Sequence, residues 1–170
     1  NATCEQALVM FYRAYIYLIH DTDVSPAGTT EKYQNVSAWA EEELEAMDEA
    51  GLIPESFLGR DMTTPITRRE MAVMLVRAMG YGTLAGLAQD LAQPFRDVTT
   101  NTGYIAMAYE LGLVSGTTAT TFSPDQTATR EQAAVMLIRL YDSYHAAAPE
   151  KTGIAYSAEG LTDLTGYGAV

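Results

Sequence analysis

The sequence has few of the residues from which catalytic and metal sites are usually built. It contains one cysteine and two histidines, and these do not stand at the spacing of metal ligands. A single cysteine excludes a disulfide within the chain. No serine lies in the glycine-flanked turn that exposes a hydrolase nucleophile. We therefore expect no enzymatic activity, no metal and no cofactor.

Basic residues and long apolar runs are also scarce. The 10 Lys and Arg residues are outnumbered by 22 Asp and Glu residues, so the formal net charge is -12. A field of this sign repels the phosphates of nucleic acids and of anionic membranes. The apolar runs are much shorter than the ~20 residues of a membrane-spanning helix. We expect neither nucleic acid binding nor membrane insertion.

The sequence does contain one segment in three versions. They read NATCEQALVMFYRAY (1–15), PITRREMAVMLVRAM (65–79) and TATREQAAVMLIRLY (127–141). Each version places apolar residues at helical spacing and then reaches an arginine. A recurring period slightly above 60 residues indicates an internal repeat.

Each version also begins with a Ser/Thr-x-x-Glu/Gln pattern, which is the signature of a capping box. In that box the threonine oxygen accepts from an early helix amide, and the Glu or Gln side chain reaches back to the threonine amide. We predict that a helix starts after each threonine. The capping pairs are Thr3 with Gln6, Thr67 with Glu70, and Thr129 with Gln132.

Shorter helical patterns precede two of the three boxes. The runs WAEEELEAMDEA (39–50) and YIAMAYEL (104–111) are each followed by a glycine, Gly51 or Gly112, as is common at the end of a helix. One repeat therefore reads as a helix, a loop and a capped helix. The composition between these units predicts a polar, turn-rich linker at 21–32, a linker with some helical content at 81–94, and a third linker at 145–155.

The two ends of the chain read as halves of a third repeat. Residues 1–20 hold only the capped helix, and GYGAV (166–170) matches GYIAM (103–107) at the start of a first helix. A half-repeat cannot bury its apolar face alone. The two halves are therefore expected to pair, either within one chain or between neighbouring chains.

The predicted fold class is all-α. We expect one domain, 1–170, of three helix-loop-helix units, with the third unit made from the two terminal halves. The segments are 1–20 (second half of a repeat), 33–80 and 95–144 (whole repeats), and 156–170 (first half of a repeat).

These motifs resemble the S-layer homology repeats of bacterial cell-surface proteins. The resemblance implies a pseudo-threefold all-α fold that anchors proteins noncovalently to cell-wall polysaccharide, commonly a pyruvylated secondary polymer. The chain departs from the family pattern at Cys4, where the pattern has arginine. The matching pieces are VSAWA (36–40), ITRRE (66–70), FRDV (95–98), GLVSG (112–116), TFSPD (121–125) and ATREQ (128–132).

Arg68 and Arg130 follow the cap threonine, where a positive charge opposes the helix dipole at a cost of about 0.3–1 kcal/mol. One explanation is an anion site in which free helix amides and the guanidinium, with Arg69 beside it, hold a carboxylate such as the pyruvate that the resemblance implies. The other is that each arginine donates to loop carbonyls and clamps the loop between the helices. Both explanations can hold together. Cys4 has neither a positive charge nor a guanidinium that could bind a carboxylate at two points, and it is expected to be a small buried residue.

Trp39 is the only tryptophan and stands where a first helix starts. Its ring is a candidate platform for stacking on sugars, and the alternative is a core anchor. The residues expected in the packed helical interior include Met71, Met74, Tyr104, Tyr109 and Met136.

Two functions are compatible with these patterns. The first is a noncatalytic extracellular module that anchors a surface protein to anionic wall polysaccharide. Its expected contact residues are Trp39, Arg68, Arg69 and Arg130. The second is a self-assembling filament or S-layer-type subunit whose half-repeats complement neighbouring subunits. A glycan-processing enzyme ranks third, because no pair of carboxylates stands out from the other acidic residues.

Overall fold

Helices form the regular structure of the described residues. The computed structural model describes residues 1–19, 30–88 and 94–147, and these contain isolated bridges but no strands. The predicted all-α class is confirmed. The α-helices are α1 (Cys4–Ile19), α2 (Glu41–Glu49), α3 (Arg68–Ala78), α4 (Gly82–Leu87), α5 (Thr102–Glu110) and α6 (Arg130–Ala147), with one 3-10 turn, η1 (Glu55–Phe57).

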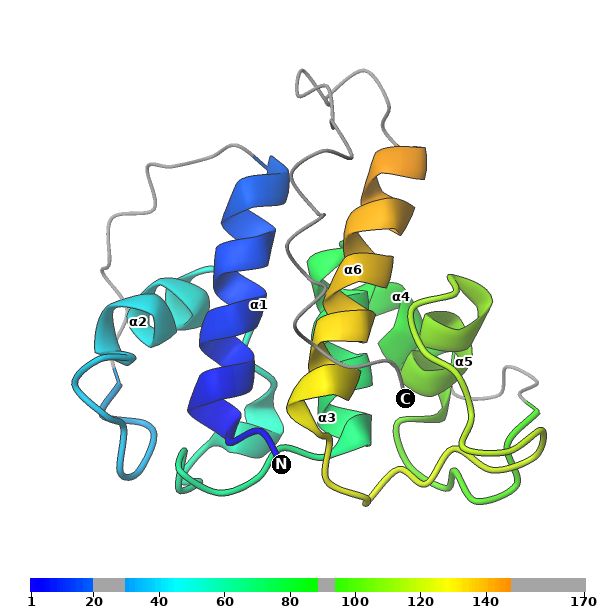
Figure 1. The fold of residues 1–170 in the computed structure, drawn as a ribbon, viewed down its shortest axis with the longest axis horizontal. Helices are drawn as coiled ribbons and strands as arrows, with labels where there is room; N and C mark the ends of the chain where they lie inside the picture. Colours follow the sequence, from blue (N-terminus) through cyan, green and yellow to red (C-terminus); the bar gives the residue numbers. More distant parts are fainter. Residues whose placement is uncertain (20–29, 89–93, 148–170) are drawn as a thin grey trace, which may run out of the picture.

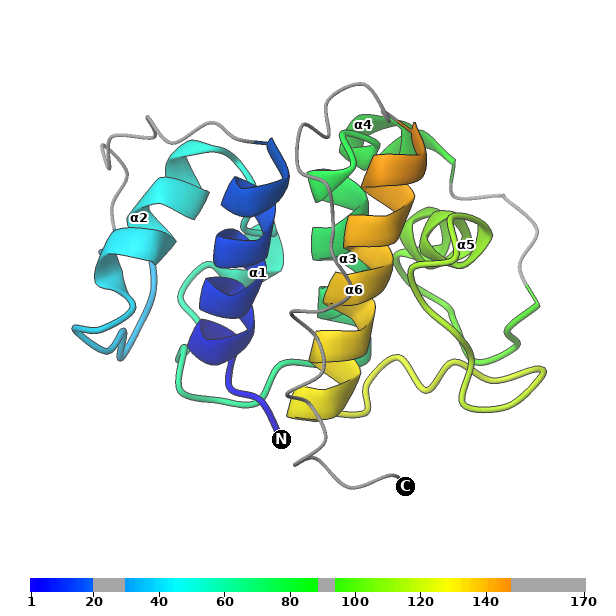
Figure 2. The same cartoon turned by 45° about the horizontal axis from the view of Figure 1, so that its top comes forward.

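The three helices that follow the capping boxes lie side by side in the middle of the molecule (Figures 1 and 2). Shorter helices flank them: α2 packs on α1, and α5 packs on α3. Helix α4 fills the corner between α3 and α5. Each shorter helix therefore covers the outer side of one long helix.

The long helices start where the capping patterns predict. At α3 the Thr67 hydroxyl accepts from the Glu70 amide, and the Glu70 carboxylate accepts from the Thr67 amide at 2.8 Å. The same reciprocal pair joins Thr3 to Gln6 at α1 and Thr129 to Gln132 at α6. These bonds satisfy helix amides that would otherwise lack a partner within the helix.

The residues just before the three cap threonines form a closed ring of backbone hydrogen bonds. Ala2 donates to the Ala128 carbonyl at 3.0 Å, Ala128 donates to Ile66 at 2.8 Å, and Ile66 donates back to Ala2 at 3.1 Å. All three residues are fully buried. Because buried backbone groups need partners, this ring fixes the three helix starts against one another.

The pseudo-threefold arrangement of complete repeats stays a prediction. The ring joins equivalent positions of the three repeats, but the C-terminal half-repeat, 156–170, lies outside the described residues. The described repeats share one continuous apolar core, in which Phe11, Phe57 and Phe122 are among the largest fully buried side chains.

Glycines end both short helices as expected. Gly51 after α2 has φ +66°, and Gly112 after α5 has φ +71°. This left-handed conformation suits glycine because it lacks a Cβ atom.

The predicted linkers are only partly right. The linker predicted at 145–155 starts too early, because residues 145–147 form the last turn of α6. The reason is that alanine is the best helix former and the His145 ring packs on the ring of Tyr141 one turn earlier, at 3.9 Å between centroids. The helical content expected within 81–94 is present as α4, and most of the linker 21–32 lies outside the described residues. None of the described helices has the length and hydropathy that a membrane span needs.

The capping box at α3 gives a stability prediction. Replacing Thr67 with alanine removes the hydroxyl that accepts from Glu70, so the free energy of unfolding should fall by about 1 kcal/mol. Thr83→Ala is the control, because Thr83 is exposed and lies inside α4. Urea denaturation followed by circular dichroism measures both, and an equal effect of the two changes would contradict the role of the cap.

Candidate functional site

Arg68 connects the start of α3 to the loop of the following repeat. Its side chain is 4% exposed. Its Nε donates to the Phe122 carbonyl at 2.9 Å, and its Nη2 donates to the Ser115 carbonyl at 2.7 Å. The guanidinium also stacks on the Phe122 ring, with 4.6 Å from Cζ to the centroid. These contacts match the loop-clamp explanation for this arginine.

The peptide of Phe122 is held from both sides. Asp97 accepts from the Phe122 amide at 2.9 Å and from the Ser123 amide at 2.7 Å, while Arg68 holds the Phe122 carbonyl. Burial alone would raise the pKa of Asp97, but these two amides and the charge of Arg68 outweigh it and hold the pKa below its ordinary value. Burial lowers the pKa of Arg68.

The helix amides at the start of α3 are not free, and this corrects the expected anion site. The Arg68 amide donates to Gln126 at 2.9 Å and the Arg69 amide donates to Pro124 at 3.0 Å. The Glu70 amide donates to the cap hydroxyl. An anion therefore has no open amides at this end of α3, because the neighbouring loop already uses them.

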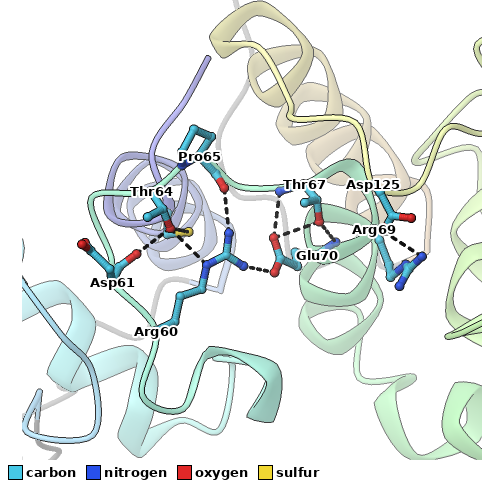
Figure 3. Close-up of polar contacts among 9 residues, drawn as sticks. Arg60, Asp61, Thr64, Pro65, Thr67, Arg69, Glu70 and Asp125 are labelled. Atoms are coloured by element: carbon cyan, nitrogen blue, oxygen red, sulfur yellow. Dashed lines mark hydrogen bonds and ion pairs between the residues drawn. The ribbon is translucent and has the colours of Figure 1, made fainter.

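The boundary between the repeat that contains α1 and the repeat that contains α2 and α3 has its arginine in the loop and not at the start of the helix. Cys4 takes the position of Arg68 and is fully buried, as expected, with a pKa raised by burial. Arg60, seven residues before Thr67, takes the position that Phe122 has before Thr129. Arg60 donates to the Thr64 hydroxyl and the Pro65 carbonyl, and it pairs with Glu70 (Figure 3).

The side chains of Arg130 and Trp39 are both exposed to solvent. Arg130 follows its cap threonine as Arg68 does, but its side chain is exposed. Trp39 is 51% exposed, so the alternative that it anchors the core is wrong. Both side chains are open to solvent, and both remain candidates for contact with a ligand.

A cleft of about 390 Å³ lies between α3 and α5. Arg69 and Arg77 line it from α3, Tyr104 lines it from α5, and Asn101 lines it from the N-cap of α5. Asn101 has φ +52°, an uncommon conformation for a non-glycine residue, and its side chain makes no capping hydrogen bond. We call this feature the α3/α5 cleft.

The two arginines of the α3/α5 cleft have spare donors. The Nε atoms of Arg69 and Arg77 are buried, and neither has a hydrogen-bond partner among the described residues. Arg77 uses Nη1 for two long bonds, to the Gly51 and Ile53 carbonyls at 3.3 and 3.4 Å. Buried guanidinium donors without partners are costly, so a hydrogen bond from either donor to an anion would be favourable.

Two of the three acidic residues that line the α3/α5 cleft, Glu70 and Asp125, form ion pairs with arginines. Glu70 pairs with Arg60 and accepts from Thr67, and Asp125 pairs with Arg69 at 2.9 Å (Figure 3). Glu55 is exposed at the wall of the cleft. Its carboxylate is the charge that opposes an anion at this place.

At the matching place between α1 and α2 the arginine is paired with a carboxylate. Arg13 stands ten residues after Thr3, as Arg77 does after Thr67. Its Nε and Nη2 both donate to Glu43, at 3.1 and 2.6 Å. Tyr104 of the α3/α5 cleft corresponds to Glu43, since each stands eight residues before the glycine that ends its helix. The tyrosine thus removes the carboxylate that would neutralise Arg77.

Sequence reasoning found Arg69 but missed Arg77, Asn101 and Tyr104. The signal for Arg77 was present, since each of the three repeated segments reaches an arginine after its apolar run. Whether that arginine is neutralised depends on the residue that faces it from another repeat, and the sequence of the segment does not reveal that residue. Among the described residues no cluster of His, Cys, Asp and Glu could hold a metal ion.

Comparison with known proteins identifies the second whole repeat. Residues 94–134, which run from the loop before α5 to the first turn of α6, match the S-layer homology domain family. The match covers 41 of the 170 residues of the chain. This match, together with a relative that is a cell surface protein, indicates a cell-surface, cell-wall-associated protein.

Two relatives share the S-layer homology region. One is an endoglucanase of Bacillus sp. (strain KSM-635), 40% identical over 82 residues. The other is a cell surface protein of Thermoanaerobacter kivui, 35% identical over 78 residues. The matches cover 47% and 44% of this chain but 8% and 10% of the relatives. The chain therefore spans a tenth or less of the relatives it matches.

Arg68 and Arg130 form a matched pair for testing the loop clamp. Arg68→Met leaves two loop carbonyls without their donor, so the free energy of unfolding should fall by about 2–4 kcal/mol. Arg130→Met changes an exposed side chain at the same repeat position and should shift it by less than about 0.5 kcal/mol. Urea denaturation compares them, and equal losses would contradict a special role of Arg68.

Asp97 predicts a pH dependence of stability. Its pKa is lower in the folded chain than its ordinary 3.8, so its contribution is present above about pH 4 and is lost as the pH falls through the folded value. Asp97→Asn should lower the free energy of unfolding at pH 7 and flatten its fall in acid. The control is Asp142→Asn, at an exposed position of α6. Denaturation series between pH 7 and the acid limit of folding measure both slopes, and parallel slopes for wild type and Asp97→Asn would contradict the role of Asp97.

Proposed function

We propose that this chain anchors a surface protein by binding a carboxylate-bearing cell-wall polysaccharide in the α3/α5 cleft. The observation that carries the proposal is that Arg69 and Arg77 line one cleft and that each has a buried Nε atom without a hydrogen-bond partner among the described residues. A guanidinium binds a carboxylate through two parallel N–H donors, one of which is often Nε. A pyruvate ketal presents such a carboxylate on a sugar ring.

The charge of the whole chain makes a local site necessary. At a net charge of -12 the chain repels an anionic polymer at long range. Binding therefore requires a place where cationic donors are not neutralised. The α1/α2 boundary fails this requirement because Arg13 is paired with Glu43, whereas Arg77 has no carboxylate partner among the described residues. We therefore place the carboxylate of the polymer in the α3/α5 cleft.

Other surface groups extend the contact in this proposal. Trp39 offers a half-exposed aromatic face for a sugar ring, and Arg130 offers an exposed charge. Arg68 acts indirectly, because it holds the loop that carries Asp125 beside Arg69. The chain has no catalytic role in this proposal and needs no cofactor.

Retention on purified wall polysaccharide tests the cleft. Arg77→Gln removes the charge and the guanidinium's two parallel donors, so affinity should fall by roughly tenfold to a hundredfold, as expected for about 1.5–3 kcal/mol per hydrogen bond to a charged group. Arg13→Gln is the matched control at the same helix position and should leave retention unchanged. Melting curves confirm that each variant is folded.

Two further measurements test whether the bound group is a carboxylate. Glu55→Gln removes the opposing carboxylate and should strengthen retention. Polymer stripped of pyruvate ketals by mild acid should bind the wild-type chain and Arg77→Gln equally weakly. If Arg77→Gln and Arg13→Gln bind alike, or if the stripped polymer binds as well as the intact one, the proposed cleft is not the site.

A further inference from the structure

A second cavity adjoins the α3/α5 cleft, and we call it the α4 cavity. Its volume is about 550 Å³. Arg77 and Tyr104 line both the α4 cavity and the α3/α5 cleft, so these two side chains form a shared wall. The rest of the α4 cavity is lined by the turn after α2, the turn after α3, and helix α4.

The two cavities follow one another along α3. Arg69 lines only the α3/α5 cleft, and it lies eight residues before Arg77, which is about 12 Å along the helix axis. Gly80 lines only the α4 cavity and lies three residues after Arg77. Each volume falls within the range of about 300–1,000 Å³ that is typical of small-molecule sites. The pair therefore has room for more than one sugar residue.

The charge of the α4 cavity suits an anionic polymer. Arg77 lines it, and no Asp or Glu is among the described residues that do so. The α3/α5 cleft, by contrast, is lined by Glu55, Glu70 and Asp125. In a chain with 22 acidic residues, a surface of this kind spares the further carboxylates of a polymer the repulsion that they would meet elsewhere.

Two glycines of α4 keep the α4 cavity open. A Cβ on Gly82 would lie 3.1 Å from the Cγ atom of Arg77, so a side chain there would displace the arginine. Gly86 has more space, since a Cβ there would have the Tyr104 hydroxyl as its nearest neighbour, at 3.7 Å. Leu87 is 80% exposed and adds an apolar surface to the cavity. Because glycine weakens a helix, helix stability does not explain Gly86, whereas an open cavity does.

We propose that the α4 cavity binds the sugar residue next to the one whose carboxylate lies in the α3/α5 cleft. The chain then holds at least two successive residues of the polysaccharide, with Arg77 and Tyr104 between them. This inference rests on the function proposed for the α3/α5 cleft. It adds that the length of the bound polymer, and not only its carboxylate, contributes to affinity.

Affinity for polymer fragments of two lengths tests the proposal. The probes are fractions of one and of three sugar residues that retain their pyruvate ketals, isolated by size from an enzymatic digest of purified wall polysaccharide. The wild-type chain should bind the longer fraction about tenfold more tightly. Gly86→Leu fills the α4 cavity, so this ratio of affinities should fall to about one. Titration calorimetry measures the affinities, and melting curves show whether the variant is folded.

A matched pair keeps the test valid if Gly86→Leu disturbs folding. Thr83 and Leu84 are neighbouring exposed residues of α4, but only Thr83 lines the cavity. Thr83→Tyr should lower the preference for the longer fraction, and Leu84→Tyr should keep it at about tenfold. Equal preferences in the two tyrosine variants would count against the α4 cavity.

The outcome for Arg77→Gln separates this inference from the proposed function. Suppose that Arg77→Gln weakens binding of both fractions, but that the wild-type chain binds the two fractions equally, or that Gly86→Leu keeps the tenfold preference. The α4 cavity is then not a subsite, while the function of the α3/α5 cleft stands. If Arg77→Gln changes the affinity for neither fraction, the function proposed for the cleft fails and this inference fails with it.

Discussion

The structure depends on the fixation of one loop peptide, that of Phe122. Its amide is held by Asp97 of its own repeat and its carbonyl by Arg68 of the preceding repeat, while its ring lies under the Arg68 guanidinium. The same loop supplies the carbonyls that satisfy the first amides of α3. A single loop therefore completes one repeat and caps the next helix, so neither repeat has a finished boundary without the other.

This mutual dependence explains why the two repeat boundaries differ in what they offer to a ligand. At the first boundary Arg60 stands in the loop and pairs with Glu70, and Arg13 is neutralised by Glu43. At the second boundary the loop position is filled by Phe122, and Tyr104 replaces the neutralising carboxylate. The packing of the helices is alike in both places, whereas the supply of open guanidinium donors is not. Binding capacity in such a repeat is set by a few exchanged side chains on an unchanged frame.

The sequence was sufficient for features whose causes are local. Capping boxes at Thr3, Thr67 and Thr129 involve residues three apart, and they located the starts of α1, α3 and α6. Features that depend on a partner in another repeat could not be read in this way. The dipeptide Thr-Arg occurs at 67–68 and at 129–130, yet one arginine is buried under a loop and the other is exposed. The exposure of Trp39, the spare donors of Arg77 and the last turn of α6 likewise depend on side chains that tertiary packing brings near.

The ring of Ala2, Ile66 and Ala128 has a consequence for how such a chain can be connected. Each member donates once and accepts once, so the ring has no first member and no last one. The order in which the backbone visits the three corners is therefore irrelevant to the hydrogen bonds that join them. A circularly permuted chain, opened in any one of the connecting loops, would meet the same requirement at its centre.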